Sequence, residues 1–218
     1  MTARPDDDPI PADVPMSAGL RALARKGELR RYRKGTLLIQ EGDHGDQLYI
    51  LLTGSVKAYS TDERDREITY GTLAPGDYFG EMSLDGGPRS ASVITLEATR
   101  CSVVSREILR EHIANDAQFA FELLERVIAR VRALTDNARS LALLGVYPRL
   151  VKLLNTQAQE LPDGRRALPA RLTHQALANH VGASREMVSR LMKDLARGGY
   201  VAVEQHRIVL VRPLPTSW

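Results

Sequence analysis

The stretch from Thr173 to Leu195, THQALANHVGASREMVSRLMKDL, decides how the C-terminal part of the chain folds. Thr173 is a favourable helix N-cap, and Gly182 suits the left-handed backbone that often ends a helix. Ser184 stands where it would cap a second helix. Two short helices joined by a glycine turn form a helix-turn-helix, so we predict this motif over residues 173–195.

The two predicted helices divide their residues between a buried and an exposed face. The apolar positions are Leu177, Ala178, Val181, Val188, Leu191, Met192 and Leu195. The N-terminal residues of the second helix enter the major groove, where Arg pairs with guanine and Glu accepts from cytosine. The predicted DNA-contacting residues are Thr173, Gln175, Ser184, Arg185, Glu186, Ser189, Arg190 and Lys193. A purely structural alternative is a Glu186–Arg190 ion pair on an amphipathic helix pair.

Two strand-like runs, Tyr200–Glu204 and Arg207–Val211, follow the motif and are interpreted as a wing. Residues 146–218 contain 11 Lys and Arg against 5 Asp and Glu, a net charge of +6, whereas the whole chain carries only +3. A basic C-terminal third on a slightly acidic body indicates a polyanionic partner. A solvated basic face would give the same composition.

The N-terminal half shows short alternating runs separated by Gly and Asp, which is typical of an antiparallel sandwich or barrel. The predicted strands are Thr36–Ile39, Leu48–Leu52, Ser55–Tyr59, Ile68–Leu73, Ala91–Thr95 and Cys101–Val104. Strands followed by helices place the chain in the α+β class.

The spacing of apolar residues changes in the segment from about Asp116 to Leu144. This segment contains no Pro or Gly and is predicted to be a long helix. Apolar residues recur there at intervals of three and four, namely Leu124, Val127, Val131, Leu134, Ala138 and Leu141. This narrow stripe favours a seam between the helices of two subunits. A single amphipathic helix packed on its own domain is the alternative. Gly145 and Pro148 are expected to end the helix, and a second helical run over Arg149–Gln159 precedes the turn 161–164.

A loop between predicted strands, DYFGEMSLDGGPRSA at residues 77–91, concentrates chemically useful side chains. Gly80 lets the backbone approach a ligand, and the Glu81 carboxylate can accept from a hydroxyl. Arg89 and Ser90 are adjacent donors suited to a phosphate. A structural Glu81–Arg89 ion pair would explain the same residues without a ligand.

The chain resembles the cyclic-AMP receptor and fumarate–nitrate regulator family of bacterial transcription factors from about Leu20 to Leu210. The motifs that carry the resemblance are Gly42-Asp43, Leu48-Tyr49-Ile50, Gly54-Ser55-Val56, the run Gly76–Glu81, Arg89-Ser90-Ala91 and the run Val181–Arg190. The resemblance implies a jelly-roll-like cyclic-nucleotide-binding β-roll, a long dimerisation helix and a winged helix-turn-helix. We assign these to residues 17–115, 116–145 and 146–218, after a disordered leader over residues 1–16.

The resemblance also implies roles for single residues. Glu81 would hold the ribose 2′-hydroxyl, while Arg89 and Ser90 would hold the cyclic phosphate beside the backbone of Gly80 and Met82. The positions that meet adenine fall on Leu134 and Thr135, where Leu134 departs from the usual threonine. Arg130 matches an arginine that braces the pocket. The resemblance to the cyclic-AMP receptor at Arg185, Glu186 and Arg190 implies palindromic sites with TGTGA-like half-sites.

Composition limits the other possibilities. One cysteine, Cys101, allows neither an internal disulfide nor an iron–sulfur cluster, and we expect no metal or cofactor. His44 and His112 stay open as haem ligands. No signal peptide or membrane span is evident, so we expect a cytoplasmic protein without a membrane partner.

These observations lead to one functional hypothesis and two alternatives. The hypothesis is a homodimeric transcription regulator that binds double-stranded DNA under the control of cyclic AMP and contacts RNA polymerase. One alternative keeps the fold but has a regulator that needs no ligand or answers another small molecule. The other is a nucleotide-binding module that regulates an enzyme; the C-terminal third shows no catalytic constellation, so we expect no enzyme activity.

Overall fold

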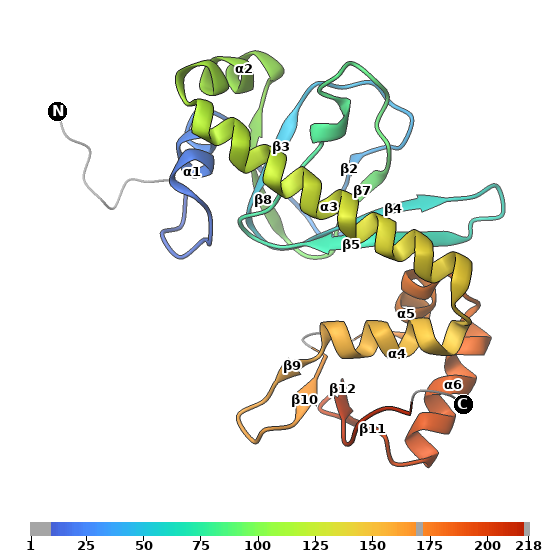
Figure 1. The fold of residues 1–218 in the computed structure, drawn as a ribbon. Coiled ribbons are helices and arrows are strands. Elements are labelled where there is room, and N and C mark those ends of the chain that lie inside the picture. Colours follow the sequence, from blue (N-terminus) through green and yellow to red (C-terminus); the bar gives the residue numbers. More distant parts are fainter. Residues whose placement is uncertain (1–9, 169–171, 216–218) are drawn as a thin grey trace. The chain divides into compact units, whose positions relative to one another are not determined.

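The computed structural model describes residues 10–168 and 172–215 and divides into two compact units (Figure 1). The first unit comprises the described parts of residues 1–60 and 69–130, and the second those of 61–68 and 131–218. The long helix α3 (Ala117–Leu143) contributes residues to both units.

Two four-stranded antiparallel sheets build the β-roll of the N-terminal half, in the orders β1-β8-β3-β6 and β2-β7-β4-β5 (Figure 1). Each of the six predicted strands is confirmed within two residues at its ends. The strands are β1 (Glu28–Tyr32), β2 (Leu37–Ile39), β3 (Leu48–Thr53), β4 (Val56–Thr61), β5 (Glu67–Leu73), β6 (Tyr78–Phe79), β7 (Ser92–Thr95) and β8 (Thr99–Val104). β1 and β6 were not predicted, because β1 is rich in charge and β6 is only two residues long.

Strand β3 is the centre of this unit because both of its faces are buried. Successive side chains of a strand point to opposite faces. Leu48, Ile50 and Leu52 pack in a cluster with helical residues, while Tyr49 and Leu51 pack in the cluster between the sheets. The strand positions β6, which leads directly into the predicted ligand loop, through pairing of Tyr49 with Phe79.

The predicted disordered leader over residues 1–16 is wrong for residues 10–16; residues 1–9 lie outside the described part of the chain. Ile10 is only 1% exposed and packs in the core beside α1 (Ala18–Ala24). Arg21 of α1 donates hydrogen bonds to the carbonyl oxygens of Pro11, Ala12 and Val14. The Pro and Asp composition concealed two buried side chains, Ile10 and Val14, that anchor this segment.

The predicted long helix is confirmed as α3, which follows a shorter helix, α2 (Arg106–Asn115). Leu124 and Val131 are 52% and 55% exposed, and Leu134 and Leu141 are also exposed. Val127, predicted to lie in the stripe, is half-buried, whereas its neighbour Ile128 is exposed. The exposed stripe therefore shifts by one residue at this turn. We call Phe121, Leu124, Ile128, Val131, Thr135 and Ala138, spaced alternately by three and four, the α3 stripe.

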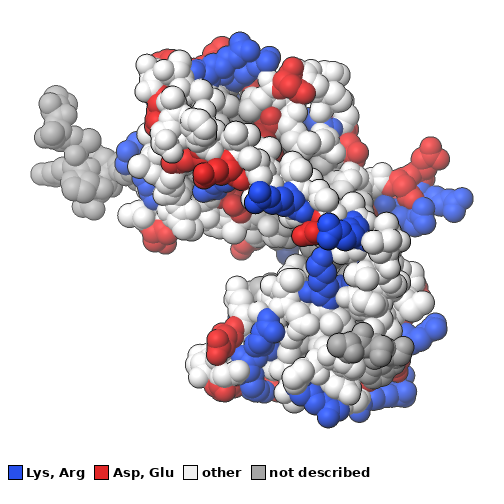
Figure 2. Space-filling view, viewed as in Figure 1, with Lys and Arg blue, Asp and Glu red and all other residues white. Residues whose placement is uncertain are grey.

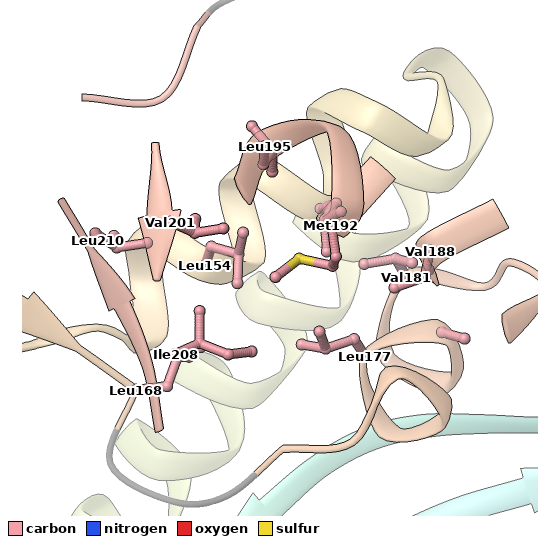
Figure 3. Close-up of a cluster of buried hydrophobic side chains, with 12 residues drawn as sticks. Leu154, Leu168, Leu177, Val181, Val188, Met192, Leu195, Val201, Ile208 and Leu210 are labelled. Carbon is pink, nitrogen blue, oxygen red and sulfur yellow. The ribbon is translucent and has the colours of Figure 1, made fainter. Parts of the chain in front are cut away.

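The C-terminal unit packs three helices against a small antiparallel sheet of order β11-β12-β10-β9. The elements are α4 (Val146–Gln157), β9 (Gln159–Glu160), β10 (Arg166–Ala167), α5 (His174–Val181), α6 (Arg185–Arg197), β11 (Val201–Glu204) and β12 (Arg207–Leu210). Figure 3 shows leucines of α4, α5 and α6 meeting Ile208 and Leu210 of the sheet in one cluster. Helix α4 begins at Val146 rather than at the predicted Arg149, since proline is tolerated in the first turn of a helix.

The predicted helix-turn-helix is confirmed, with the expected caps. The Thr173 hydroxyl accepts from the Ala176 amide at 3.1 Å, and the Ser184 hydroxyl accepts from the Met187 amide at 3.2 Å. Gly182 has a φ of 61°, as its place between the helices requires. The predicted wing is the β11–β12 hairpin, which turns at Gln205 and His206, both at positive φ.

Candidate ligand-binding and DNA-binding sites

The predicted ligand loop follows β6 and is shaped by Gly80. This residue has a φ of 89° and precedes a short 3-10 helix, Glu81–Ser83. A Cβ at position 80 would lie 2.7 Å from the Gln47 carbonyl oxygen and 2.8 Å from Nη1 of Arg89. Only glycine combines this backbone conformation with such close neighbours.

Arg89 is a buried cation that forms no ion pair with any of the described residues. The residue is 7% exposed, and its two Nη atoms donate to the carbonyl oxygens of Gly80 at 2.7 Å and Gln47 at 3.1 Å. Among the ion pairs of the described residues, none includes Arg89. Burial lowers the pKa of this guanidinium, more than the nearby Asp46 and Glu81 raise it. A buried positive charge is costly unless an anion compensates it.

Glu81 pairs with Arg130 and not with Arg89. Arg130 of α3 donates from Nη1 to Oε1 of Glu81 at 2.7 Å, and the carboxylate is 15% exposed. The same guanidinium donates to the Tyr78 carbonyl oxygen and lies 4.8 Å from the centroid of the Tyr78 ring. The alternative of a structural Glu81–Arg89 pair is therefore wrong. Arg89 stays available for another anion, and Glu81 keeps its second oxygen, Oε2, as an acceptor.

Ser90 and Met82 lie at the exposed side of the loop. The Ser90 hydroxyl donates to Sδ of Met82 at 3.2 Å, and both residues are exposed. A thioether is a weak acceptor, so a phosphate oxygen would be a better partner for this hydroxyl. The loop and Arg130 thus bring Gly80, Glu81, Met82, Arg89, Ser90 and Arg130 into one unit.

Leu134 and Thr135 belong to the second unit, and both are exposed. The Thr135 hydroxyl donates to the Val131 carbonyl oxygen at 2.9 Å within the helix. Their predicted contacts with an adenine base stay predictions.

The second helix of the helix-turn-helix presents a charged outer face. Arg185, Glu186, Arg190 and Lys193 are exposed, and Ser189 is half-buried. In Figure 2, Lys and Arg side chains are prominent along the lower edge of the C-terminal unit. Glu186 has a lowered pKa because of its own backbone amide and the Ser184 hydroxyl. The ion pairs of the described residues do not include Glu186–Arg190, so the alternative of a structural ion pair between these two residues is not observed.

Three of the predicted DNA contacts also have structural roles. Thr173 and Ser184 use their oxygen atoms as helix caps, and the Ser184 hydroxyl also stabilises the Glu186 carboxylate. Gln175 donates to Oδ1 of Asn179 at 2.7 Å. The bracing role of Arg149 was not predicted: it donates to the carbonyl oxygens of Leu141, Leu144, Val181 and Gly182. No sequence pattern reveals that an arginine will bind four backbone carbonyls.

The described residues were also compared with the requirements of a metal site, a membrane span and a reactive thiol. No group of three His, Cys, Asp or Glu residues there could hold a metal ion, and no helix there is long and apolar enough to cross a membrane. Nε2 of the buried His112 lies 3.0 Å from the Gly19 carbonyl oxygen and is already engaged. Cys101 is buried, and burial raises the pKa of its thiol to about 12, away from the lowered values typical of reactive cysteines.

Two family models match the chain, and together they cover both sites. The model of the cyclic nucleotide-binding domain matches residues 29–116, which include the ligand loop. The model of the Crp-like helix-turn-helix domain matches residues 148–213, which include α5, α6 and the wing.

Similar proteins span nearly the same length. The chain is 30% identical over 197 residues to the CRP-like cAMP-activated global transcriptional regulator of Mycobacterium tuberculosis, covering 88% of each chain. It is 31% identical over 191 residues to the cAMP-activated global transcriptional regulator Vfr of Pseudomonas aeruginosa, covering 83% of this chain and 88% of Vfr. Among solved structures, the c-di-GMP-responsive global regulator CLP of Xanthomonas campestris is similar, with a TM-score of 0.78, 27% identity, and coverage of 89% of this chain and 98% of that one.

Proposed function

Because the chain belongs to the cyclic-AMP receptor and fumarate–nitrate regulator family of transcription regulators, we propose that cyclic AMP binds the ligand loop and controls binding to palindromic DNA. The observation that carries the ligand proposal is Arg89, a buried cation without an ion-pair partner among the described residues. Of its five N–H donors, two bind backbone carbonyls, which leaves three for a cyclic phosphate.

The other ligand contacts follow from the geometry around Arg89. Ser90 is the next residue and has an exposed hydroxyl that can join it on the phosphate. Glu81, held by Arg130, offers its free carboxylate oxygen to the ribose 2′-hydroxyl, beside the backbone of Gly80 and Met82. Leu134 and Thr135 are proposed to meet the adenine. The names of the Mycobacterium and Pseudomonas relatives favour cyclic AMP, while that of the Xanthomonas regulator makes c-di-GMP the competing ligand.

Dimerisation and DNA recognition complete the proposal. The exposed α3 stripe is proposed to be the seam of a homodimer, because a row of apolar residues this long is costly in water. The paired recognition helices would reach successive major grooves about 34 Å apart. Arg185, Glu186 and Arg190 would read TGTGA-like half-sites, with Thr173, Gln175, Ser184, Ser189 and Lys193 beside them. RNA polymerase is the proposed protein partner, and the cytoplasm the proposed location.

The ligand proposal is tested by calorimetric titration of the full-length protein with cyclic AMP, cyclic GMP and c-di-GMP. We expect cyclic AMP to bind most tightly, and Glu81→Ala and Arg89→Ala each to weaken it roughly 10- to 100-fold, since each removes a charge-assisted hydrogen bond. Arg110→Ala, which removes a charge from the exposed surface of α2, is the matched control and should bind like the wild type. Unchanged affinity in Arg89→Ala, or preference for c-di-GMP, would contradict the proposal.

A further inference from the structure

Two arginines of α3 bind the edge of β6 that faces away from β3. In the described part of the chain β6 pairs with β3 alone, and the carbonyl oxygen of Asp77, just before β6, accepts from a backbone amide of β3 at 2.9 Å. The Gly76 carbonyl oxygen accepts instead from Nη1 of Arg126 at 2.9 Å. The Tyr78 carbonyl oxygen accepts from Nη2 of Arg130. Carbonyls at the free edge of a sheet have no strand to bond, and the two guanidinium groups take its place.

The spacing of the two arginines matches the spacing of the two carbonyls. Arg126 and Arg130 are one helical turn apart on the same face of α3, about 6 Å along the helix axis. Gly76 and Tyr78 are separated by a single residue, which is about 6.6 Å along an extended chain. Each guanidinium can therefore reach its own carbonyl at the same time. We call Arg126, Arg130, Gly76 and Tyr78 the β6 clasp.

The side chain of Tyr78 packs between β6 and α3. Its ring is fully buried, and the ring centroid lies 5.7 Å from Cζ of Arg126 and 4.8 Å from Cζ of Arg130. The Tyr78 hydroxyl donates to the Leu123 carbonyl oxygen of α3 at 3.1 Å. Cations near the face of an aromatic ring are attracted to it, so the ring supports both arginines. The clasp therefore joins two closely packed elements.

The two arginines of the clasp differ in their relation to the proposed ligand site. Arg130 also donates to the carboxylate of Glu81, a proposed ligand contact. The printed partners of Arg126 are the Gly76 carbonyl, the Tyr78 ring and the Asp77 carboxylate, none of which is a proposed ligand contact. The Arg126–Asp77 pair is 3.9 Å apart with side chains 37% and 43% exposed, so it contributes little. The main bond of Arg126 is thus the one to Gly76.

We infer that Arg126 is a positioning residue that fixes the direction and rotation of α3 on β6, and so allows a nucleotide in the ligand loop to change the affinity for DNA. Arg130 alone would hold α3 at one point and leave the helix free to pivot there, whereas two points one turn apart prevent this. The inference rests on the proposed function and deepens it, because it assigns regulation to a residue outside the ligand contacts. Loss of Arg126 should leave nucleotide binding intact and weaken its effect on DNA.

The test measures nucleotide binding and the response of DNA binding separately. Calorimetry gives the dissociation constant of cyclic AMP. Fluorescence anisotropy at fixed salt gives the response ratio, which is the affinity for a TGTGA palindrome with saturating cyclic AMP divided by the affinity without it. A merely structural role of Arg126 would lower thermal stability without changing this ratio.

Three substitutions distinguish the bond from the bulk of the side chain. Arg126→Met keeps an unbranched stem but removes the charge and the donors, whereas Arg126→Lys keeps the charge and an N–H donor. Arg110→Met, on the exposed surface of α2, is the matched control. Circular dichroism and thermal unfolding establish that each protein is folded. If Arg126→Met does not fold, Arg126→Gln, which is polar but too short to reach Gly76, replaces it.

We expect Arg126→Met to bind cyclic AMP within about threefold of the wild type and to lower the response ratio about 5- to 10-fold, as for one lost charge-assisted hydrogen bond. Arg126→Lys should retain most of the ratio, and Arg110→Met all of it. An unchanged ratio in Arg126→Met, a ratio equally low in Arg126→Lys, or a larger loss of nucleotide affinity overturns the inference while the proposed function stands. If the wild type does not respond to cyclic AMP, the proposed function fails and the inference fails with it.

Discussion

Arg89 is the residue whose environment most strongly supports the proposed ligand site. Its guanidinium is buried against two backbone carbonyls. These carbonyls accept two of its hydrogen bonds, but they carry no net charge and do not neutralise the cation. Glu81, which the structural alternative paired with Arg89, is held by Arg130 instead. A bound phosphate would supply the missing negative charge, and planar bidentate contacts of this kind are among the strongest that arginine makes.

Base recognition can be tested at a single residue, Arg185. Its exposed side chain follows the Ser184 cap, at the end of α6 that is proposed to enter the major groove. Arg185→Ala should reduce discrimination between guanine and another base in the half-site by roughly 1–3 kcal/mol. The measurement compares binding to duplexes that differ at one base pair, with Arg197→Ala in the last turn of α6 as control. Equal losses on the palindrome and on scrambled DNA would show that Arg185 contacts only phosphate.

For single residues, the sequence predicted local roles such as helix caps better than it predicted contacts between residues far apart in the chain. Thr173, Gly182 and Ser184 act as predicted because capping depends only on neighbours along the chain. The Glu81–Arg130 pair joins residues 49 positions apart, and the bonds from Arg89 to backbone reach Gln47. Such contacts depend on how the loop closes over the sheet, which no local pattern specifies.

At the scale of a secondary-structure element, the proposed dimer seam on α3 can be tested by a substitution. Ile128→Glu places a carboxylate in the proposed seam, where two copies would meet near the two-fold axis. Desolvating two unpaired charges costs several kcal/mol, so we expect the dimer dissociation constant to rise about 100-fold or more. Sedimentation velocity at micromolar concentration measures this, since the wild type should sediment as a dimer and the variant as a monomer.

Ala129→Glu is the matched control for the seam, because it adds the same charge at the next exposed position, outside the stripe. It should remain dimeric. A dimeric Ile128→Glu variant, or a monomeric wild type, would mean that α3 is not the dimer seam.

Helices and strands were predicted correctly where apolar residues recur at regular spacing. They were missed where charged residues interrupt that spacing. The six alternating runs and the long helix were found because one face of each is apolar. The one-residue shift of the stripe, from Val127 to Ile128, could not be seen, because both residues are apolar and only packing distinguishes them. Strand β1 alternates charged residues with few apolar ones, and its pairing with β8 is what defines it.

At the scale of the whole molecule, we propose that α3 couples the ligand site to the DNA-binding site. Arg130 ties it to the ligand loop, and the helix continues into the unit that carries the helix-turn-helix. Cyclic AMP can shift the equilibrium between states only as far as its affinities for them differ. If the proposed regulation operates, the free and the nucleotide-bound protein must differ in their affinity for DNA.

The most direct test is fluorescence anisotropy on a TGTGA palindrome and a scrambled duplex, with and without cyclic AMP. Salt must be held constant, because phosphate contacts make the affinity strongly dependent on it. The account predicts tight binding to the palindrome only when cyclic AMP is present, and weak binding to the scrambled duplex throughout. Equal affinity for the palindrome with and without cyclic AMP would contradict control by this nucleotide.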